Sequence, residues 1–236
     1  MRPVRAVLSP ASAQSSARGY DTRVLIVSAA SPPFHKNGFV VSCQSTEEAI
    51  VIDPGDEVEE LIGAIQTRKL HVRYILLTHA HLDHITGVGR AKAVFDAPVY
   101  LHEADLPLYE AVVQQGMMFG LQVQPQPRPD RFYGPDDTIR FGSCEVRVHH
   151  TPGHSPGGIC LQIGESGAAG QDLFVGDTLF AGSIGRTDLP GGDYDTLIRS
   201  IRSVLFAFGD DARAYPGHGE PTTIGRERRG NPFLQG

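Results

Sequence analysis

The chain has 236 residues, of which 40% are hydrophobic and 20% are charged, so it can form one globular domain with a sizeable core. Its formal net charge of −6 argues against nucleic acid as a partner, because phosphate binding requires a basic surface. No apolar run approaches the roughly 18 residues that a membrane span requires, so no membrane partner is expected.

Residues 1–20 differ in composition from the rest of the chain. They contain Arg2, Arg5 and Arg18, several Ser and Ala residues and no acidic residue. This composition is typical of an organelle transit peptide, but also of a disordered N-terminal extension. We favour the extension, followed by one domain over residues 21–236.

The chain has three cysteines, and none lies in a Cys-x-x-Cys pair. An odd number of unpaired cysteines argues against a disulfide framework and indicates a reducing compartment. We therefore expect the cytoplasm, with an organelle matrix as the alternative if the N-terminal segment acts as a transit peptide.

Short apolar runs predict strands over residues 24–28, 38–43 and 49–52. Residues 57–69 carry apolar side chains at helical spacing and acidic residues in the first turn, which predicts a helix. Another branched and aromatic run predicts a buried strand over residues 72–77. A strand, a helix and a further strand in this order predict a βαβ unit.

A polar cluster follows that unit directly. His79 and His81 are two residues apart, so in extended backbone both rings point the same way; Asp83 continues the alternation, and His84 begins the next helix. One loop thus offers two sets of ligands to two neighbouring metal ions, and imidazole with carboxylate suits zinc, iron or manganese. Asp53, which ends an earlier strand on the same side, either orients a ligand histidine or forms a turn.

The middle of the chain predicts a helix over residues 85–94, a strand over 98–101 and a helix over 104–120. Residues 122–130 are rich in Pro and Gln and predict a loop. This insert is expected to roof a cleft or to pack against a second copy of the chain in a homodimer, unless its methionines have an ordinary core or surface role. His102 is expected at the surface or at a helix cap.

In the second half, residues 138–141 and 145–149 predict a hairpin, with His149 and His150 as strand residues. Two further strands, a helix over residues 194–208 and a last strand over 212–215 complete the chain. Three candidate ligands follow short apolar or β-rich runs and stand beside glycine: His154, Asp177 and His218. Each alone is an ordinary turn or capping residue, but with the first cluster they give seven candidate ligands from four loops.

This set of motifs, in this order, resembles the metallo-β-lactamase-fold superfamily from about Val24 to the C-terminus. The resemblance implies an α/β fold, a single-domain αββα four-layer sandwich. Within the superfamily, Gly182–Asp188 and the tail over residues 225–234 are similar to short glyoxalase II-type hydrolases. Persulfide dioxygenases have similar loops.

The resemblance also implies the role of each ligand. One metal ion would be held by His79, His81 and His154, and the other by Asp83, His84 and His218. Asp177 would bridge the two ions, which we expect to be zinc, with iron or manganese as alternatives. A hydroxide between the ions would attack a carbonyl carbon, and Asp83 would orient it or pass a proton.

The expected reaction is hydrolysis of a thioester, because a thiolate with a pKa near ~8.5 leaves without help from a strong general acid. The expected substrate is a small acyl-glutathione such as lactoylglutathione. Full-length glyoxalase II proteins add a helical domain that helps to hold glutathione, whereas eighteen residues follow His218 here. Arg186 is the candidate for a substrate carboxylate, unless it forms a salt bridge with Asp188 or Asp193.

Two other activities are compatible with the same residues. A persulfide dioxygenase would hold one Fe(II) with His79, His154 and Asp177. A broad-specificity hydrolase with weak β-lactamase activity is the second alternative, although an aspartate at position 177 argues against the lactamase subclasses. A non-catalytic binding module is disfavoured because no ligand position is empty.

Overall fold

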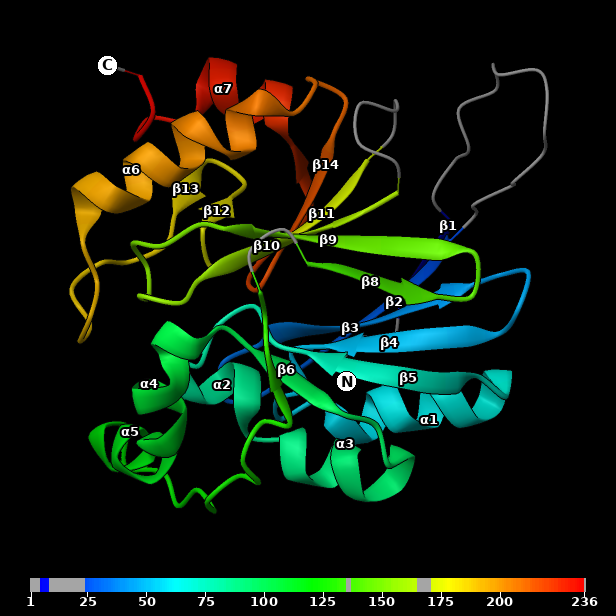
Figure 1. The fold of residues 1–236 in the computed structure, drawn as a ribbon. Helices are drawn as coiled ribbons and strands as arrows, with labels where there is room; N and C mark the ends of the chain where they lie inside the picture. The colour runs from blue at the N-terminus through cyan, green and yellow to red at the C-terminus, as the bar shows by residue number, and fades with distance from the viewer. Residues whose placement is uncertain (1–4, 9–23, 135–136, 165–170, 236) are drawn as a thin grey trace, which may run out of the picture.

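Two large β-sheets pack face to face, and helices cover the outer face of each (Figure 1). The computed structural model describes residues 5–8, 24–134, 137–164 and 171–235. This layering confirms the expected fold class, an α/β single-domain sandwich with αββα layers. None of the helices within these ranges is long and apolar enough to cross a bilayer.

The first sheet has seven strands within the described residues, and they pair in chain order: β1 (Arg5–Leu8), β2 (Val24–Ser31), β3 (Lys36–Cys43), β4 (Glu48–Ile52), β5 (His71–Leu76), β6 (Val99–Leu101) and β7 (Arg131–Phe132). Strands β1 to β4 are antiparallel, whereas β4 to β7 are parallel. The parallel β4–β5 pair requires a crossover, and α1 (Val58–Arg68) supplies it, so the predicted βαβ unit is confirmed.

Strand β1 lies in the segment that we expected to be a disordered extension. It pairs antiparallel with Leu25–Ser28 of β2, so the expectation is wrong for Arg5–Leu8. The physical reason is that β2 offers an unpaired edge to a short apolar run. The other residues of the segment lie outside the described ranges.

Helices α1 and α3 (Val88–Phe95) cover the outer face of the first sheet (Figure 1). Between β5 and β7 lie four further helical segments: α2 (Leu82–Ile85), η1 (Glu103–Asp105), α4 (Leu106–Glu110) and α5 (Val112–Met118). The single helix predicted over residues 104–120 is therefore broken, with a bend at Ala111. The break accompanies three hydrogen bonds of Gln115, which donates to the carbonyls of Ala80 and Leu108 and accepts from the amide of Leu82.

The second sheet has, in the part of the chain that the structure describes, six strands in the order β15-β14-β11-β10-β9-β8. In chain order these are β8 (Thr138–Phe141), β9 (Cys144–His150), β10 (Ile159–Ile163), β11 (Asp172–Gly176), β14 (Arg213–Pro216) and β15 (Thr222–Thr223). A small hairpin, β12 (Leu179–Phe180) and β13 (Ser183–Ile184), follows β11. The outer layer consists of α6 (Tyr194–Ser203), η2 (Leu205–Ala207) and α7 (Ile224–Gly230).

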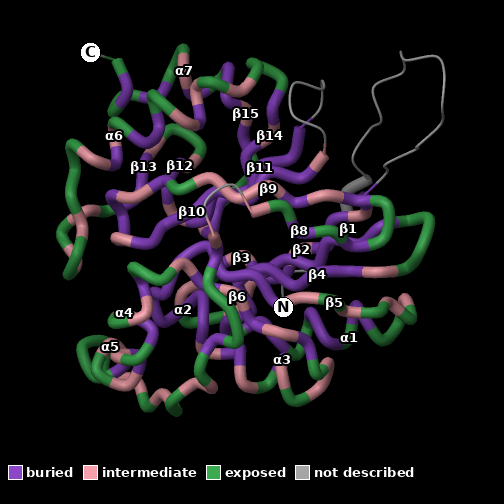
Figure 2. The backbone as a smooth tube through the Cα atoms, viewed as in Figure 1, coloured by how far each residue is buried: buried purple, intermediate pink, exposed green. Residues whose placement is uncertain are grey.

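The core divides into three apolar layers, one between each pair of neighbouring structural layers (Figure 2). In the layer between the sheets, Phe39 of the first sheet packs edge-on against Phe174 of the second, with ring centroids 5.0 Å apart. Phe174 also stacks on Tyr215 at 5.0 Å. These aromatic contacts fix how the two sheets face each other, and hence how their loops meet.

At one edge of the sandwich, backbone hydrogen bonds join loops from both sheets. The amide of Ile159 at the start of β10 donates to the carbonyl of Thr78 after β5. The amide of Asn37 in β3 donates to the carbonyl of Gly217, whose own amide donates to Gly176. The loops that carry the candidate ligands therefore meet at this edge.

We predict that Phe174→Ala lowers the free energy of unfolding by about 3–5 kcal/mol, because it leaves a cavity between the sheets. Phe233→Ala is the control: this ring is 47% exposed, and its loss changes stability by less than about 0.5 kcal/mol. Urea denaturation followed by circular dichroism measures both. A loss below about 1 kcal/mol for Phe174→Ala would contradict the role given to this contact.

Candidate metal centre

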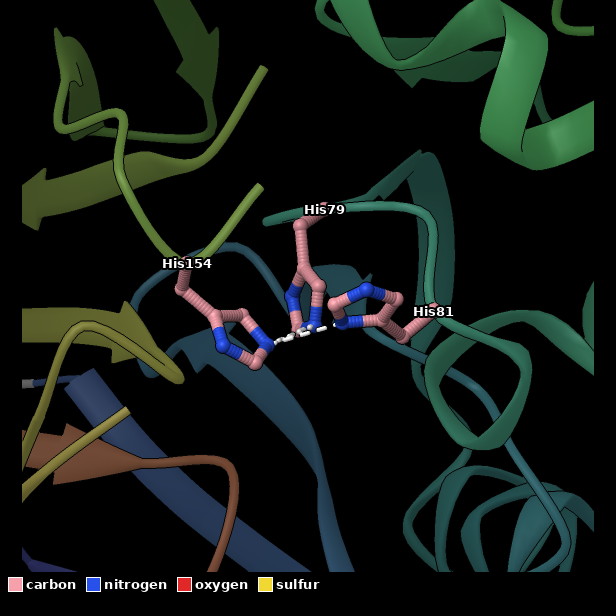
Figure 3. A group of neighbouring side chains, drawn as sticks. All are labelled: His79, His81 and His154. Carbon is pink, nitrogen blue, oxygen red and sulfur yellow. Dashed lines mark hydrogen bonds between the residues drawn. The ribbon is translucent and has the colours of Figure 1, made fainter. Parts of the chain in front are cut away.

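All seven predicted ligands converge at this edge, in two groups joined by one carboxylate. The first group, which we call site 1, consists of His79, His81 and His154, whose rings face one another (Figure 3). The Nε2 atom of His154 lies 2.8 Å from Nδ1 of His81 and 3.2 Å from Nε2 of His79. All three histidines are buried.

The second group, site 2, consists of Asp83, His84 and His218. The Nε2 atom of His218 lies 3.1 Å from Oδ2 of Asp83, and Nε2 of His84 lies 3.8 Å from the same oxygen. His84 is fully buried, whereas the side chain of His218 is 34% exposed. Site 2 therefore faces the solvent on the side of His218.

Asp177 lies between the two sites. Its Oδ2 atom is 3.7 Å from Nε2 of His154 in site 1 and 3.5 Å from Nε2 of His218 in site 2. Its Oδ1 atom is 3.4 Å from Nε2 of His84. One carboxylate thus contacts imidazoles of both sites, as a bridging ligand must.

The loop after β5 divides its candidate ligands between the two sites as the resemblance implies, but its local geometry differs from the prediction. His81 has an extended conformation (φ −71°, ψ 149°) and precedes α2, which begins at Leu82. Asp83 and His84 therefore stand on a helical turn, and the alternation predicted to include Asp83 is wrong. The helix places both side chains in site 2, and the ring of His84 also lies 4.0 Å from that of His79 in site 1.

The carboxylate of Asp53 orients a ligand from each site. Its Oδ2 atom lies 2.9 Å from Nδ1 of His84, and its Oδ1 atom accepts a hydrogen bond from the amide of Thr78 at 2.7 Å. The hydroxyl of Thr78 donates to Asp53 and lies 3.2 Å from Nδ1 of His79. With Nδ1 engaged in this way, Nε2 of each ring faces the cluster. The contact with a candidate ligand histidine that was considered for Asp53 is therefore present, and its orienting role stays a prediction.

His154 is oriented by a backbone group. Its Nδ1 atom donates to the carbonyl of Arg186 at 2.7 Å. The guanidinium of Arg186 makes two bonds to Asp188, at 2.7 and 2.8 Å, and its side chain is 55% exposed. The salt bridge with Asp188, which was the alternative to substrate binding, is therefore present, and binding of a substrate carboxylate by Arg186 stays a prediction.

Comparison with known proteins shows the family of the chain. A model of the metallo-beta-lactamase superfamily matches residues 32–218. The chain belongs to this superfamily. It is 41% identical over 190 residues to the hydroxyacylglutathione hydrolase GloC of Haemophilus influenzae, an alignment that covers 80% of this chain and 88% of GloC.

Two solved structures are also similar to the chain. The first is the BLEG-1 B3 metallo-beta-lactamase, with 35% identity, a TM-score of 0.82, and coverage of 89% of this chain and 100% of BLEG-1. The second is TTHA1623 in a di-iron-bound form, with 40% identity, a TM-score of 0.77, and coverage of 88% of this chain and 99% of TTHA1623.

The electrostatics of the site favour a cation. Burial, reinforced by the neighbouring imidazoles, lowers the pKa of His79 well below its usual value, and it lowers the pKa of His81 to about 3. Burial would also lower the pKa of His84, but the carboxylates of Asp83, Asp177 and Asp53 raise it to about 10. His79 and His81 therefore offer neutral imidazoles in site 1, whereas the carboxylates around His84 bring negative charge to site 2.

Unsatisfied polar atoms show that the residues fit metal ions. The Nε2 atom of His84 and the Oδ1 atom of Asp177 are buried and have no hydrogen-bond partner among the described residues. Such atoms are costly unless they bind something. Imidazoles and carboxylates in two groups, with a carboxylate between them, suit two divalent cations.

A buried ion pair near the site is not predicted by the sequence. Lys36 and Glu57 are each 1% exposed, and Nζ of Lys36 lies 2.7 Å from Oε1 of Glu57. The ammonium also donates to the carbonyl of Asp53. The sequence gives no signal for this contact, because a lysine in a strand usually points to solvent.

The other histidines considered above stay outside the cluster. His102 accepts a hydrogen bond from the amide of Ala104 at 3.3 Å, which confirms its capping role, and its ring stacks on that of His150 at 4.2 Å. His149 lies on β9 and its Nε2 atom is 2.8 Å from Oε1 of Gln162. Both His149 and His150 are strand residues, as predicted.

We predict that Gly217→Ala disrupts metal binding, because a Cβ atom there would lie 2.2 Å from Oδ1 of Asp177 and 2.6 Å from Cε1 of His84. Gly63→Ala is the control, since nothing lies within 4 Å of a Cβ atom at that helical position. Metal bound per chain is measured by mass spectrometry after dialysis. A full complement of metal in Gly217→Ala would contradict the close packing described here.

Proposed function

We propose that the protein is a metal-dependent hydrolase that cleaves the thioester bond of an acyl-glutathione such as lactoylglutathione. The observation that carries the proposal is the contact of Asp177 with imidazoles of both sites, at 3.4 to 3.7 Å. A carboxylate in this place suits a two-cation hydrolytic centre. The similarity to a hydroxyacylglutathione hydrolase supports the choice of substrate.

Two divalent cations would supply a water that ionises near neutral pH and a Lewis acid for the thioester carbonyl. The chain supplies the rest of the chemistry. We assign to Asp83, whose Oδ2 atom lies 3.1 Å from Nε2 of His218, the role of orienting the attacking water or passing its proton. The departing thiolate needs no protonation in the same step, because thiol pKa values lie near ~8.5.

The decisive assay combines thioester cleavage with an oxygen electrode. We expect the purified protein to release thiol from lactoylglutathione without consuming oxygen. Glutathione persulfide is the competing substrate in the same assay. Oxygen uptake with persulfide and one iron per chain would instead assign a dioxygenase that uses His79, His154 and Asp177.

A second candidate is broad hydrolysis with weak β-lactamase activity. The similarity to the BLEG-1 metallo-beta-lactamase favours it. We expect slower turnover of a chromogenic cephalosporin than of the thioester under the same metal loading. Faster turnover of the cephalosporin would reverse the order of the two candidates.

We also propose that the protein works in a reducing compartment, and we favour the cytoplasm. Cys43, Cys144 and Cys160 are buried and free, which is compatible with such an environment.

We predict that Asp177→Ala lowers kcat/KM for the thioester by more than about 100-fold, above the range for residues that merely orient a ligand. Bound metal falls as well, because the variant removes a ligand shared by both sites. Asp195→Ala, at an exposed position on α6, is the control, and we expect it to keep both kcat/KM and bound metal. Full activity of Asp177→Ala would refute a bridging role.

A further inference from the structure

Asp105 and Asn37 are polar side chains outside the ligand set that contact ligand loops, Asp105 beside the histidines of site 1 and Asn37 beside His218 of site 2. The first is Asp105, the last residue of η1, which is 0% exposed. Its Oδ2 atom accepts hydrogen bonds from the amide of Ala80 at 2.9 Å and from the hydroxyl of Ser155 at 2.8 Å. Its Oδ1 atom accepts from the amide of Gly157 at 2.5 Å.

The positions of these donors explain what Asp105 does. Ala80 lies between His79 and His81, and Ser155 follows His154. One carboxylate therefore ties together the two loops that carry all three histidines of site 1. Only a carboxylate offers two acceptor oxygens and no donor, so it can serve all three groups at once.

The second side chain is Asn37 of β3. Its Nδ2 atom donates to the carbonyls of Pro216 at 3.1 Å and Gly219 at 2.8 Å, and its backbone amide donates to Gly217 at 2.6 Å. These three carbonyls flank His218, the site 2 ligand from the second sheet. A side-chain amide has two N–H donors, which matches two carbonyl acceptors.

We propose that Asp105 and Asn37 are positioning residues that hold the two metal sites separately, Asp105 for site 1 and Asn37 for site 2. None of the three side-chain bonds of Asp105 involves the loop of His218, and none of those of Asn37 involves a site 1 loop. Asp53 differs, because it orients His84 directly and His79 through Thr78. The inference rests on the two-cation centre proposed above and is independent of the substrate.

Cobalt(II) is the probe, added to the metal-free chain and followed by visible absorption and by competition with a chelator. His154→Ala and His218→Ala identify which binding step belongs to which site. We expect Asp105→Asn to weaken the site 1 step by about 10–100-fold and to spare the site 2 step. Asn37→Ala should weaken the site 2 step by a similar factor and spare site 1, and the double variant should show both losses.

Asp130→Asn is the matched control for Asp105. Its carboxylate accepts the amide of Val99 at 2.8 Å and pairs with Lys92, at the other end of β6 from the metal loops. We expect this variant to keep both cobalt steps. If Asp105→Asn does not fold, Ser155→Ala, which removes one of the three hydrogen bonds, should weaken the site 1 step alone by a smaller factor.

Equal weakening of both steps by Asp105→Asn or by Asn37→Ala, or no weakening, would overturn the inference. A loss in Asp130→Asn as large as that in Asp105→Asn would do the same. If the native chain binds fewer than two cobalt ions, the two-cation centre on which the inference rests is absent, and the inference is overturned as well. Separate losses in the variants without any thioester cleavage would refute the proposed substrate and leave the inference standing.

Discussion

The site depends on three carboxylates that face the buried imidazole of His84. Asp83, Asp177 and Asp53 surround His84, and together they raise its pKa to about 10. A proton on His84 is the charge compensation that the chain itself can provide. Divalent cations compensate the carboxylates better, because each brings two charges to atoms that lack hydrogen-bond partners.

The four-layer sandwich is what brings these charges together. His79, His81, Asp83 and His84 follow a strand of the first sheet, whereas His154, Asp177 and His218 belong to loops of the second. Neither sheet has a complete site. The site therefore forms only when the two sheets pack together. Their apolar contacts and the hydrogen bonds at their common edge stabilise the fold and also bring the candidate ligands together.

The sequence predicts the parts of this arrangement that have local signals. The βαβ unit around α1 and the β8–β9 hairpin follow from periodicity, and the ligand motifs stand directly after strands. Strands β12, β13 and β15 have two residues each, which is too short to show the alternating hydrophobic pattern of a strand. The sequence also does not predict α7. Asp105 and Asn37 could not be identified, because their partners are distant in sequence; Asn37 and Pro216 are 179 residues apart.

Anomalous X-ray diffraction at the absorption edge of the bound metal tests the two-cation centre most directly. The expected result is two peaks on either side of the Asp177 carboxylate, about 3.5–4 Å apart, one among the site 1 histidines and one beside Asp83, His84 and His218. A single peak held by His79, His154 and Asp177 with site 2 empty, or peaks remote from Asp177, would contradict it.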